Sequence, residues 1–203
     1  MSIYELISFA VSLFAILNAF GNLPIFLSIT KDKSITEKQS IAIKATIGIG
    51  IALLIVTFIG KEFINFFGIS ISAFEIAGST IIFLTGLALI QDHSVNKEQR
   101  EESHSNNIAI VPLAIPIVVG PGSITTVTIF ARKYDTFVDL MSISATCIVL
   151  SFIIGVLFYY APKIEKVVKE EAMHVLSRIM GLILAGIACQ LFINGIKTAF
   201  HLN

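Results

Sequence analysis

Two clusters of helix-breaking residues carry the polar groups that could bind a ligand in this chain. The first cluster contains Asn18, Gly21, Asn22 and Pro24. Proline lacks a backbone N–H and glycine weakens a helix, so we expect the helix to kink or unwind here. Asn18 and Asn22 are four residues apart, which places both amides on one helix face. These amides could form a polar binding surface or hydrogen-bond a neighbouring helix, and we favour the binding surface.

The second cluster combines prolines and glycines with the hydroxyl groups that follow them. An interrupted helix has an N-terminus whose unpaired N–H groups and positive dipole end suit a carboxylate. Glycines let a ligand approach that backbone closely. Alternatively, the hydroxyls bond carbonyls of their own helix and only relieve the kink. The cluster comprises Pro112, Pro116, Gly120, Pro121, Gly122, Ser123 and Thr125.

Charged side chains are absent from the middle of every apolar segment of the sequence. Such residues usually mark proton relays or counter-ions for charged substrates, so we expect a neutral or zwitterionic small solute. Glu75 is the only acid placed to serve proton coupling. The apolar segments contain no paired aspartates, no serine with a histidine and no metal-binding cluster, so we expect neither an enzyme nor a cofactor. No channel filter or charged ring is visible either.

The elements that must position these clusters are membrane spans. Hydrophobic residues make up 55% of the chain, charged residues 14%, and the mean hydropathy is +0.88, values typical of a protein in lipid. The formal net charge of zero gives no reason to expect a nucleic acid partner. A segment of about 20 apolar residues can cross a bilayer. Six segments qualify: Ile3–Ile29, Ile41–Phe66, Ile71–Ile90, Ile108–Ala131, Phe137–Tyr160 and Val175–Phe200.

The distribution of Lys and Arg predicts the orientation of these spans. The loops after the first, third and fifth spans hold ten Lys or Arg residues, whereas the other side holds four. By the positive-inside rule the ten-charge side is cytoplasmic, which places both termini outside a prokaryotic cell membrane. Residues 91–107 then form a polar cytoplasmic linker between half repeats 1–90 and 108–203. Because each half has three spans, the halves run in opposite directions if they are related.

We therefore predict an all-α integral membrane protein with one transmembrane domain over residues 1–203. Six transmembrane helices form two inverted three-helix repeats, and the first and fourth helices are broken or kinked. The relation between the halves is supported by Gly21 and Gly120, which are 99 residues apart, and by Gly78 and Gly181, which are 103 apart.

At the two breaker clusters the chain resembles the MarC family of six-span prokaryotic membrane proteins. The resemblance is carried by Gly21, Asn22 and Pro24 in the first span and by the string Pro112, Leu113, Pro116, Gly120, Pro121 and Gly122 in the fourth. The family includes exporters or carriers of small neutral amino acids, which the resemblance implies as the activity. The chain departs from the family pattern at Ala19, Ser79 and Glu75. Ala19 replaces a frequent proline and is expected to soften the first kink.

These observations predict a secondary transporter or exporter of a small neutral solute, such as alanine or glycine, that works by alternating access. Asn18, Gly21, Asn22 and Pro24 would contact one end of the solute. Its carboxylate would lie near Pro116, Gly120, Pro121, Gly122, Ser123 and Thr125. A coupling ion, either a proton or sodium, and a homo-oligomer are left open. The alternatives are a non-transporting membrane partner or channel and, less favoured, an intramembrane enzyme.

Overall fold

The computed structural model describes residues 1–91, 118–167 and 170–200, and all secondary structure in these ranges is helical. The helices are α1 (Ile3–Leu17), α2 (Ala19–Ile29), α3 (Ile35–Phe66), α4 (Ile71–Ile90), α7 (Pro121–Lys133), α8 (Phe137–Val167) and α9 (Glu170–Phe200).

Within the described residues, five helical segments are long and apolar enough to cross a membrane. They are Ile3–Leu23, Ile35–Gly60, Ile71–Ile90, Phe137–Ile164 and Val175–Phe200. These segments confirm an integral membrane helical protein and match five of the six expected spans. Residues 108–117 of the expected fourth span and nearly all of the linker 91–107 lie outside the described ranges, as do Pro112 and Pro116. The fourth span and the inverted repeat therefore stay predictions.

Local sequence signals explain where several helices begin. Ser2 and Ser34 each accept a hydrogen bond from the backbone of a glutamate three residues later, and that glutamate bonds back to the serine N–H. This reciprocal capping box satisfies N–H groups that the first helical turn leaves free. Ser70 caps α4 in a simpler way, through Ala73 N–H. Gly68, with a φ of 65°, makes the turn between α3 and α4.

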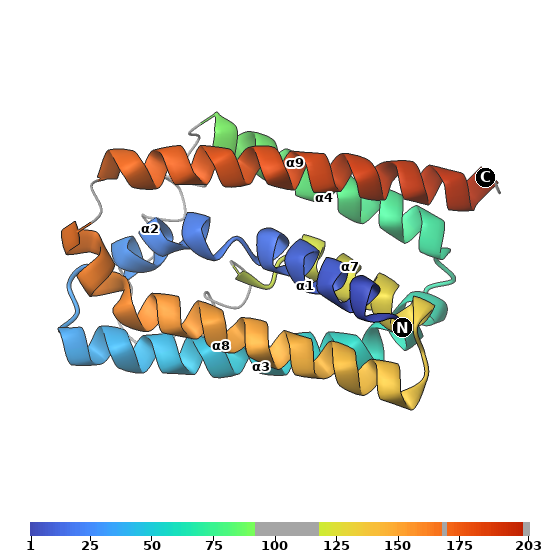
Figure 1. The fold of residues 1–203 in the computed structure, drawn as a ribbon, viewed down its shortest axis with the longest axis horizontal. Helices are drawn as coiled ribbons and strands as arrows, with labels where there is room; N and C mark the ends of the chain where they lie inside the picture. Colours follow the sequence, from blue (N-terminus) through green and yellow to red (C-terminus); the bar gives the residue numbers. More distant parts are fainter. Residues whose placement is uncertain (92–117, 168–169, 201–203) are drawn as a thin grey trace.

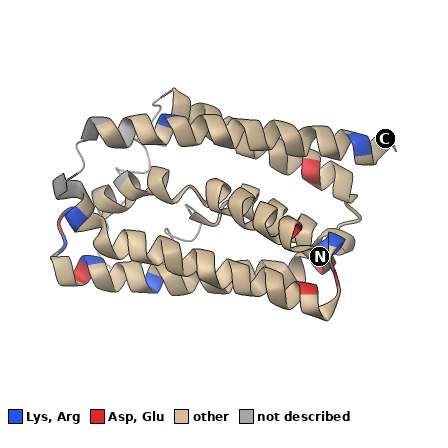
Figure 2. Ribbon diagram, in the orientation of Figure 1, with Lys and Arg blue, Asp and Glu red and all other residues tan. Residues whose placement is uncertain are grey.

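The helices form three layers along a common long direction (Figure 1). α4 packs along α9 on one side, α3 packs along α8 on the other, and α1, α2 and α7 lie between these pairs. Both chain termini lie at the same end of the bundle. Most charged residues gather toward the two ends (Figure 2), which leaves the middle of the helices to apolar side chains.

The interior is filled by large apolar side chains from the central layer and the α3–α8 pair, including Leu17, Leu23, Leu53 and Ile154. Phe26 of α2 stacks on Phe158 of α8, with ring centroids 4.7 Å apart. Many large apolar side chains are also exposed on the outside of the outer helices. The lipid core contains no water to hydrogen-bond polar groups, so an apolar exterior of this kind suits a membrane.

Small residues allow the outer helices to approach closely. A Cβ on Gly86 of α4 would lie 2.7 Å from the carbonyl oxygen of Gly181 and 2.9 Å from the N of Ala185, both on α9. On the other side, Thr46 of α3 fills the space beside Gly155 of α8. Close backbone contact is how helices associate in lipid, where apolar side chains gain little from leaving the solvent.

Candidate functional site at two helix breaks

The first break is a single residue, Asn18, in the left-handed conformation. Its φ of 45° and ψ of 51° end α1 at Leu17, and α2 begins at Ala19. Asparagine is one of the few residues other than glycine that adopts this conformation readily. The first helix is therefore interrupted and not only bent, even though Ala19 stands in place of a proline. Pro24 lies inside α2 and does not end it.

The two asparagine amides of the predicted site hold this break together. Gly21 N–H donates to the side-chain oxygen of Asn18 over 3.2 Å, in the manner of a helix N-cap. The side-chain Nδ2 of Asn22 donates to the Leu17 carbonyl, at the end of α1, over 2.9 Å. Both side chains are buried, with exposed fractions of 6% and 8%. Each asparagine side chain therefore forms a hydrogen bond with a backbone group next to the break.

Gly21 is required by the position of the Asn18 side chain. A Cβ on Gly21 would lie 2.7 Å from Cγ of Asn18, closer than real side chains approach. The glycine thus leaves room for the Asn18 amide to fold over the start of α2. In this way Asn18, Gly21 and Asn22 form one compact unit.

The second break ends at Gly120, after which α7 begins with Pro121. Gly120 is the N-cap residue and provides no side-chain hydrogen bond to the helix. Pro121 suits the first helical position because it has no N–H to leave unpaired. The N–H groups of Gly122 and Ser123 come next, and no N-cap side chain covers them. The start of α7 is therefore an uncapped helix N-terminus inside the bundle.

The hydroxyl groups of α7 divide between two roles. Ser123 donates to the Gly120 carbonyl over 2.8 Å, and Thr126 donates to the Gly122 carbonyl over 2.9 Å. For these two residues the hydroxyl bonds a nearby backbone carbonyl, which is the alternative to solvating a ligand named in the sequence analysis. Thr125 instead packs against Gly78 of α4.

The two breaks lie next to each other. A Cβ on Gly122 would lie 3.3 Å from Cγ2 of Ile16, two residues before Asn18. Gly122 also packs against Ile82 of α4, so the start of α7 lies between α1 and α4. In Figure 1 α7 lies behind α1. The start of α7 therefore contacts the last turn of α1, two residues before Asn18; that the two clusters form one site stays a prediction.

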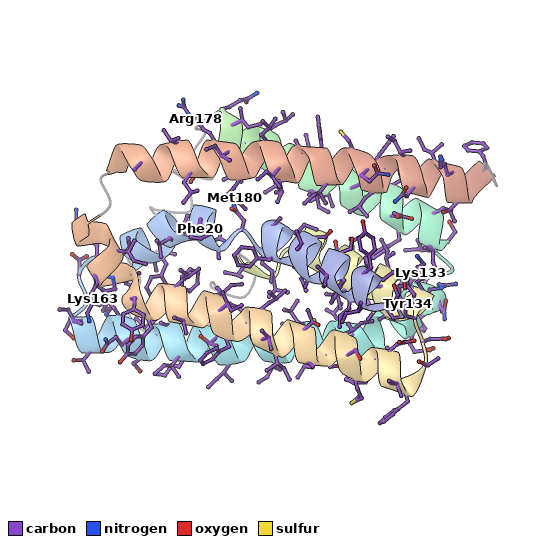
Figure 3. All side chains as sticks on the ribbon, in the orientation of Figure 1. Phe20, Lys133, Tyr134, Lys163, Arg178 and Met180 are labelled. Carbon is purple, nitrogen blue, oxygen red and sulfur yellow. The ribbon has the colours of Figure 1, made fainter. Side chains whose placement is uncertain are left out.

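A group of charged residues occupies the bundle end that carries the termini. The Tyr134 hydroxyl donates to a carboxylate oxygen of Glu5, and Lys133 Nζ lies 3.9 Å from the same oxygen. Figure 3 shows Lys133 and Tyr134 at this end. Burial and the hydrogen bond to Glu5 raise the pKa of Tyr134. The pKa of Lys133 is raised mainly by its interaction with the Tyr134 hydroxyl, so the lysine carries its charge at neutral pH.

Two buried polar groups lie outside the set of residues expected to contact the solute: Thr128, and Glu75, which the sequence indicated only as a possible proton-coupling acid. Thr128 of α7 is 1% exposed, and its hydroxyl has no hydrogen-bond partner among the described residues. Glu75 of α4 is 6% exposed, which its position near the end of a span did not predict. The depth of a residue in such a bundle depends on which helices pack beside it, and these contacts join residues distant in sequence.

The sequence is similar to a family of membrane proteins along nearly its whole length. The model of the MarC family integral membrane proteins matches residues 3–200. A UPF0056 membrane protein of Buchnera aphidicola from Acyrthosiphon pisum is 32% identical over 98% of this chain and 94% of its own length. Another, from Pyrococcus horikoshii, is 35% identical over 93% of this chain and 92% of its own length. No solved structure matches the chain.

Proposed function

The chain belongs to the MarC family of integral membrane proteins, and from this premise we propose that it is a secondary transporter of a small neutral solute. The observation that carries the proposal is the presence of two helix interruptions, at Asn18 and at Gly120, whose neighbouring residues Ile16 and Gly122 are in contact within an apolar bundle. Transporters commonly build their solute sites from such broken helices, because helix ends provide polar backbone where side chains are apolar.

The polarity of the two helix ends suits a zwitterion. The uncapped N-terminus of α7, at Gly122 and Ser123, has the positive end of a helix dipole and would bind a carboxylate. The C-terminus of α1, at Leu17, has the negative end of its dipole and directly follows Ile16, which contacts Gly122. An ammonium group there would be near the Asn18 and Asn22 amides. A small amino acid such as alanine or glycine carries both of these charges.

A repeated contact between the outer helices supports the proposed inverted repeat. Thr46 of α3 packs against Gly155 of α8, and Ser151 of α8 packs against Gly50 of α3. Thr46 and Ser151 are 105 residues apart, and so are Gly50 and Gly155. Exchange of the two halves would convert one contact into the other, as a two-fold relation between them requires.

Two halves related in this way can rock against each other and open the site to either side in turn. If the expected fourth span is present, the positive-inside rule places the end with both termini outside the cell. In this arrangement the chain would use no catalytic side chain and no cofactor. A bound solute and a coupling ion would be its only small-molecule partners.

The test is counterflow in proteoliposomes with a panel of labelled neutral amino acids. We expect saturable exchange of at least one of them by the wild-type protein. Gly120→Leu should abolish the exchange, because a large side chain would cover the N-terminus of α7. Gly186→Leu on α9 is the matched control, since a Cβ at Gly186 meets no atom within 4 Å. If no amino acid exchanges, or if both variants behave alike, the proposal is wrong; flux that does not saturate would favour a channel.

A further inference from the structure

Glu75 is an ionisable side chain that is buried in the second turn of α4. It is the only buried Asp, Glu, Lys or Arg in the described ranges, with an exposed fraction of 6%. Gly78, Ser79, Ile82 and Gly86 are buried on the same face of α4. Because Gly78 packs on α7 and Gly86 on α9, this face, and the Glu75 carboxyl with it, is directed into the bundle.

The neighbours of Glu75 do not neutralise a buried carboxylate. No described residue donates a hydrogen bond to it, and among the described side chains its one electrostatic partner is Lys133, at the end of α7. Lys133 also lies 3.9 Å from Glu5, so a single cation is shared by two carboxylates. On α9 the charged residue in the last turn, Lys197, is exposed. On α3 the nearby acid, Glu62, is exposed as well.

A carboxylate that is buried without hydrogen bonds and without a full counter-charge is strongly disfavoured in its ionised form. The group responds by taking up a proton whenever the surrounding helices close over it. A movement that brings it to water allows it to ionise again. A buried carboxyl beside moving helices is thus equipped to exchange a proton with each change of conformation.

The position of Glu75 connects it to the proposed solute site. It lies one helical turn before Gly78, and Gly78 packs directly on Thr125, in the second turn of α7. A change in the charge of Glu75 therefore acts on the contact that positions the helix whose N-terminus would bind the carboxylate. Lys133, which interacts electrostatically with Glu75, lies with Tyr134 at the bundle end that carries the termini (Figure 3).

We propose that Glu75 is the coupling site at which the transporter binds and releases a proton in each cycle. This inference rests on the proposed transport function. A proton from water on one side binds a carboxylate oxygen of Glu75 and gives the neutral acid for the buried state. The acid releases the proton to water on the other side, and no other bond forms or breaks.

The first experiment compares exchange with accumulation in proteoliposomes for the wild-type protein, Glu75→Gln and the control Glu62→Gln. The amide keeps the shape of the buried side chain but cannot release a proton. We expect Glu75→Gln to retain counterflow exchange and to lose solute accumulation driven by a pH gradient. With one proton per solute, a gradient of one pH unit supports about tenfold accumulation in the wild type. The variant should equilibrate without accumulation, and Glu62→Gln should match the wild type.

The outcomes separate this inference from the proposed function. If the wild type exchanges solute and Glu75→Gln still accumulates it under a pH gradient, the coupling role of Glu75 is wrong and the transport function stands. The same holds if only a sodium gradient drives accumulation. If the wild type exchanges no solute, both proposals fail.

A second measurement does not depend on a stable variant. Dicyclohexylcarbodiimide reacts with protonated carboxyls in apolar surroundings, and mass spectrometry locates the adduct. We expect the wild-type protein to be modified at Glu75, less so as the pH rises, and to be protected when solute is added. The exposed Glu62 is the internal comparison. Absence of modification at Glu75 from acidic to mildly alkaline pH would overturn the inference.

Discussion

The contact between Gly86 and Gly181 offers a sharp test of how the outer helices pack. We predict that Gly86→Ala destabilises the protein, because the new Cβ would lie 2.7 Å from the Gly181 carbonyl oxygen and 2.9 Å from Ala185 N. These neighbours are backbone atoms of a long helix and cannot turn aside as a flexible side chain can. A comfortable contact needs about 3.5 Å, so α4 and α9 would have to separate by roughly 0.8 Å.

The magnitude follows from two opposing terms. Overpacking of a tight contact costs about 1–3 kcal/mol. Replacement of glycine by alanine inside a helix returns about 0.5–1 kcal/mol through the reduced backbone entropy of the unfolded chain. With backbone on both sides of the contact we place the first term in the upper half of its range, which gives a net loss of about 1–2 kcal/mol. For a chain of this size each kcal/mol lowers the melting temperature by about 2–4 °C.

The assay uses the buried thiol of Cys147, which is 0% exposed and becomes reactive only when the bundle opens. The exposed Cys189 is first replaced by alanine, and reaction with a thiol-specific dye is followed in detergent as the temperature rises. Gly186→Ala on α9 is the control, because a Cβ there meets no atom within 4 Å and only the entropic gain remains. The melting temperature should fall for Gly86→Ala and stay level or rise for Gly186→Ala. Equal shifts for the two variants would refute the close contact.

Three further predictions concern single polar groups, and the same melting assay measures them. Asn18→Ala should cost about 2 kcal/mol, from the left-handed conformation and the lost cap, whereas Asn18→Gly should cost less because glycine adopts a φ of 45° freely. Thr128→Val should stabilise by about 1 kcal/mol because it removes a buried hydroxyl without a partner, while Thr57→Val, whose hydroxyl is bonded, should not. Tyr134→Phe should destabilise the protein at neutral pH, because it removes the hydrogen bond from the Tyr134 hydroxyl to Glu5. Since the pKa of Tyr134 is raised in the folded protein, the stability that this hydroxyl contributes is complete below the usual tyrosine pKa and is lost as the pH rises through the raised pKa. A difference in melting temperature between wild type and variant that does not change with pH would contradict this prediction.

Much of the architecture could be predicted because one property, the length of apolar segments, decides where a chain crosses a bilayer. That property located the five candidate spans, although the observed helix ends differ from the expected ones by several residues. The second span, for example, begins with α3 at Ile35 and not at Ile41. The early start comes from the Ser34 capping box, since capping continues a helix into polar sequence beyond the apolar stretch.

The candidate site could be predicted in its residues but not in its geometry. Sequence alone indicated breaks near Gly21 and Pro24, because both residues weaken helices. The structure places the break at Asn18, whose conformation and side-chain bond depend on how the two flanking helix segments meet. Pro24 removes one N–H from α2 without ending it. The burial of Glu75 could not be predicted from the sequence either, because it depends on α7 and α9 covering one face of α4.

The two breaks differ in how completely they satisfy their own backbone, and this difference assigns them different roles in the proposed transporter. At the first, Asn18 and Asn22 supply side-chain partners to the freed N–H and carbonyl groups. At a break formed by one left-handed residue with side-chain hydrogen bonds, the angle between α1 and α2 could change without leaving an unpaired polar group in lipid. At the second, Gly120 gives α7 no cap, so the N–H groups after Pro121 keep their capacity to bind an anion. The first break therefore suits a hinge and the second a ligand site, and their contact through Ile16 and Gly122 would transmit solute binding to the hinge.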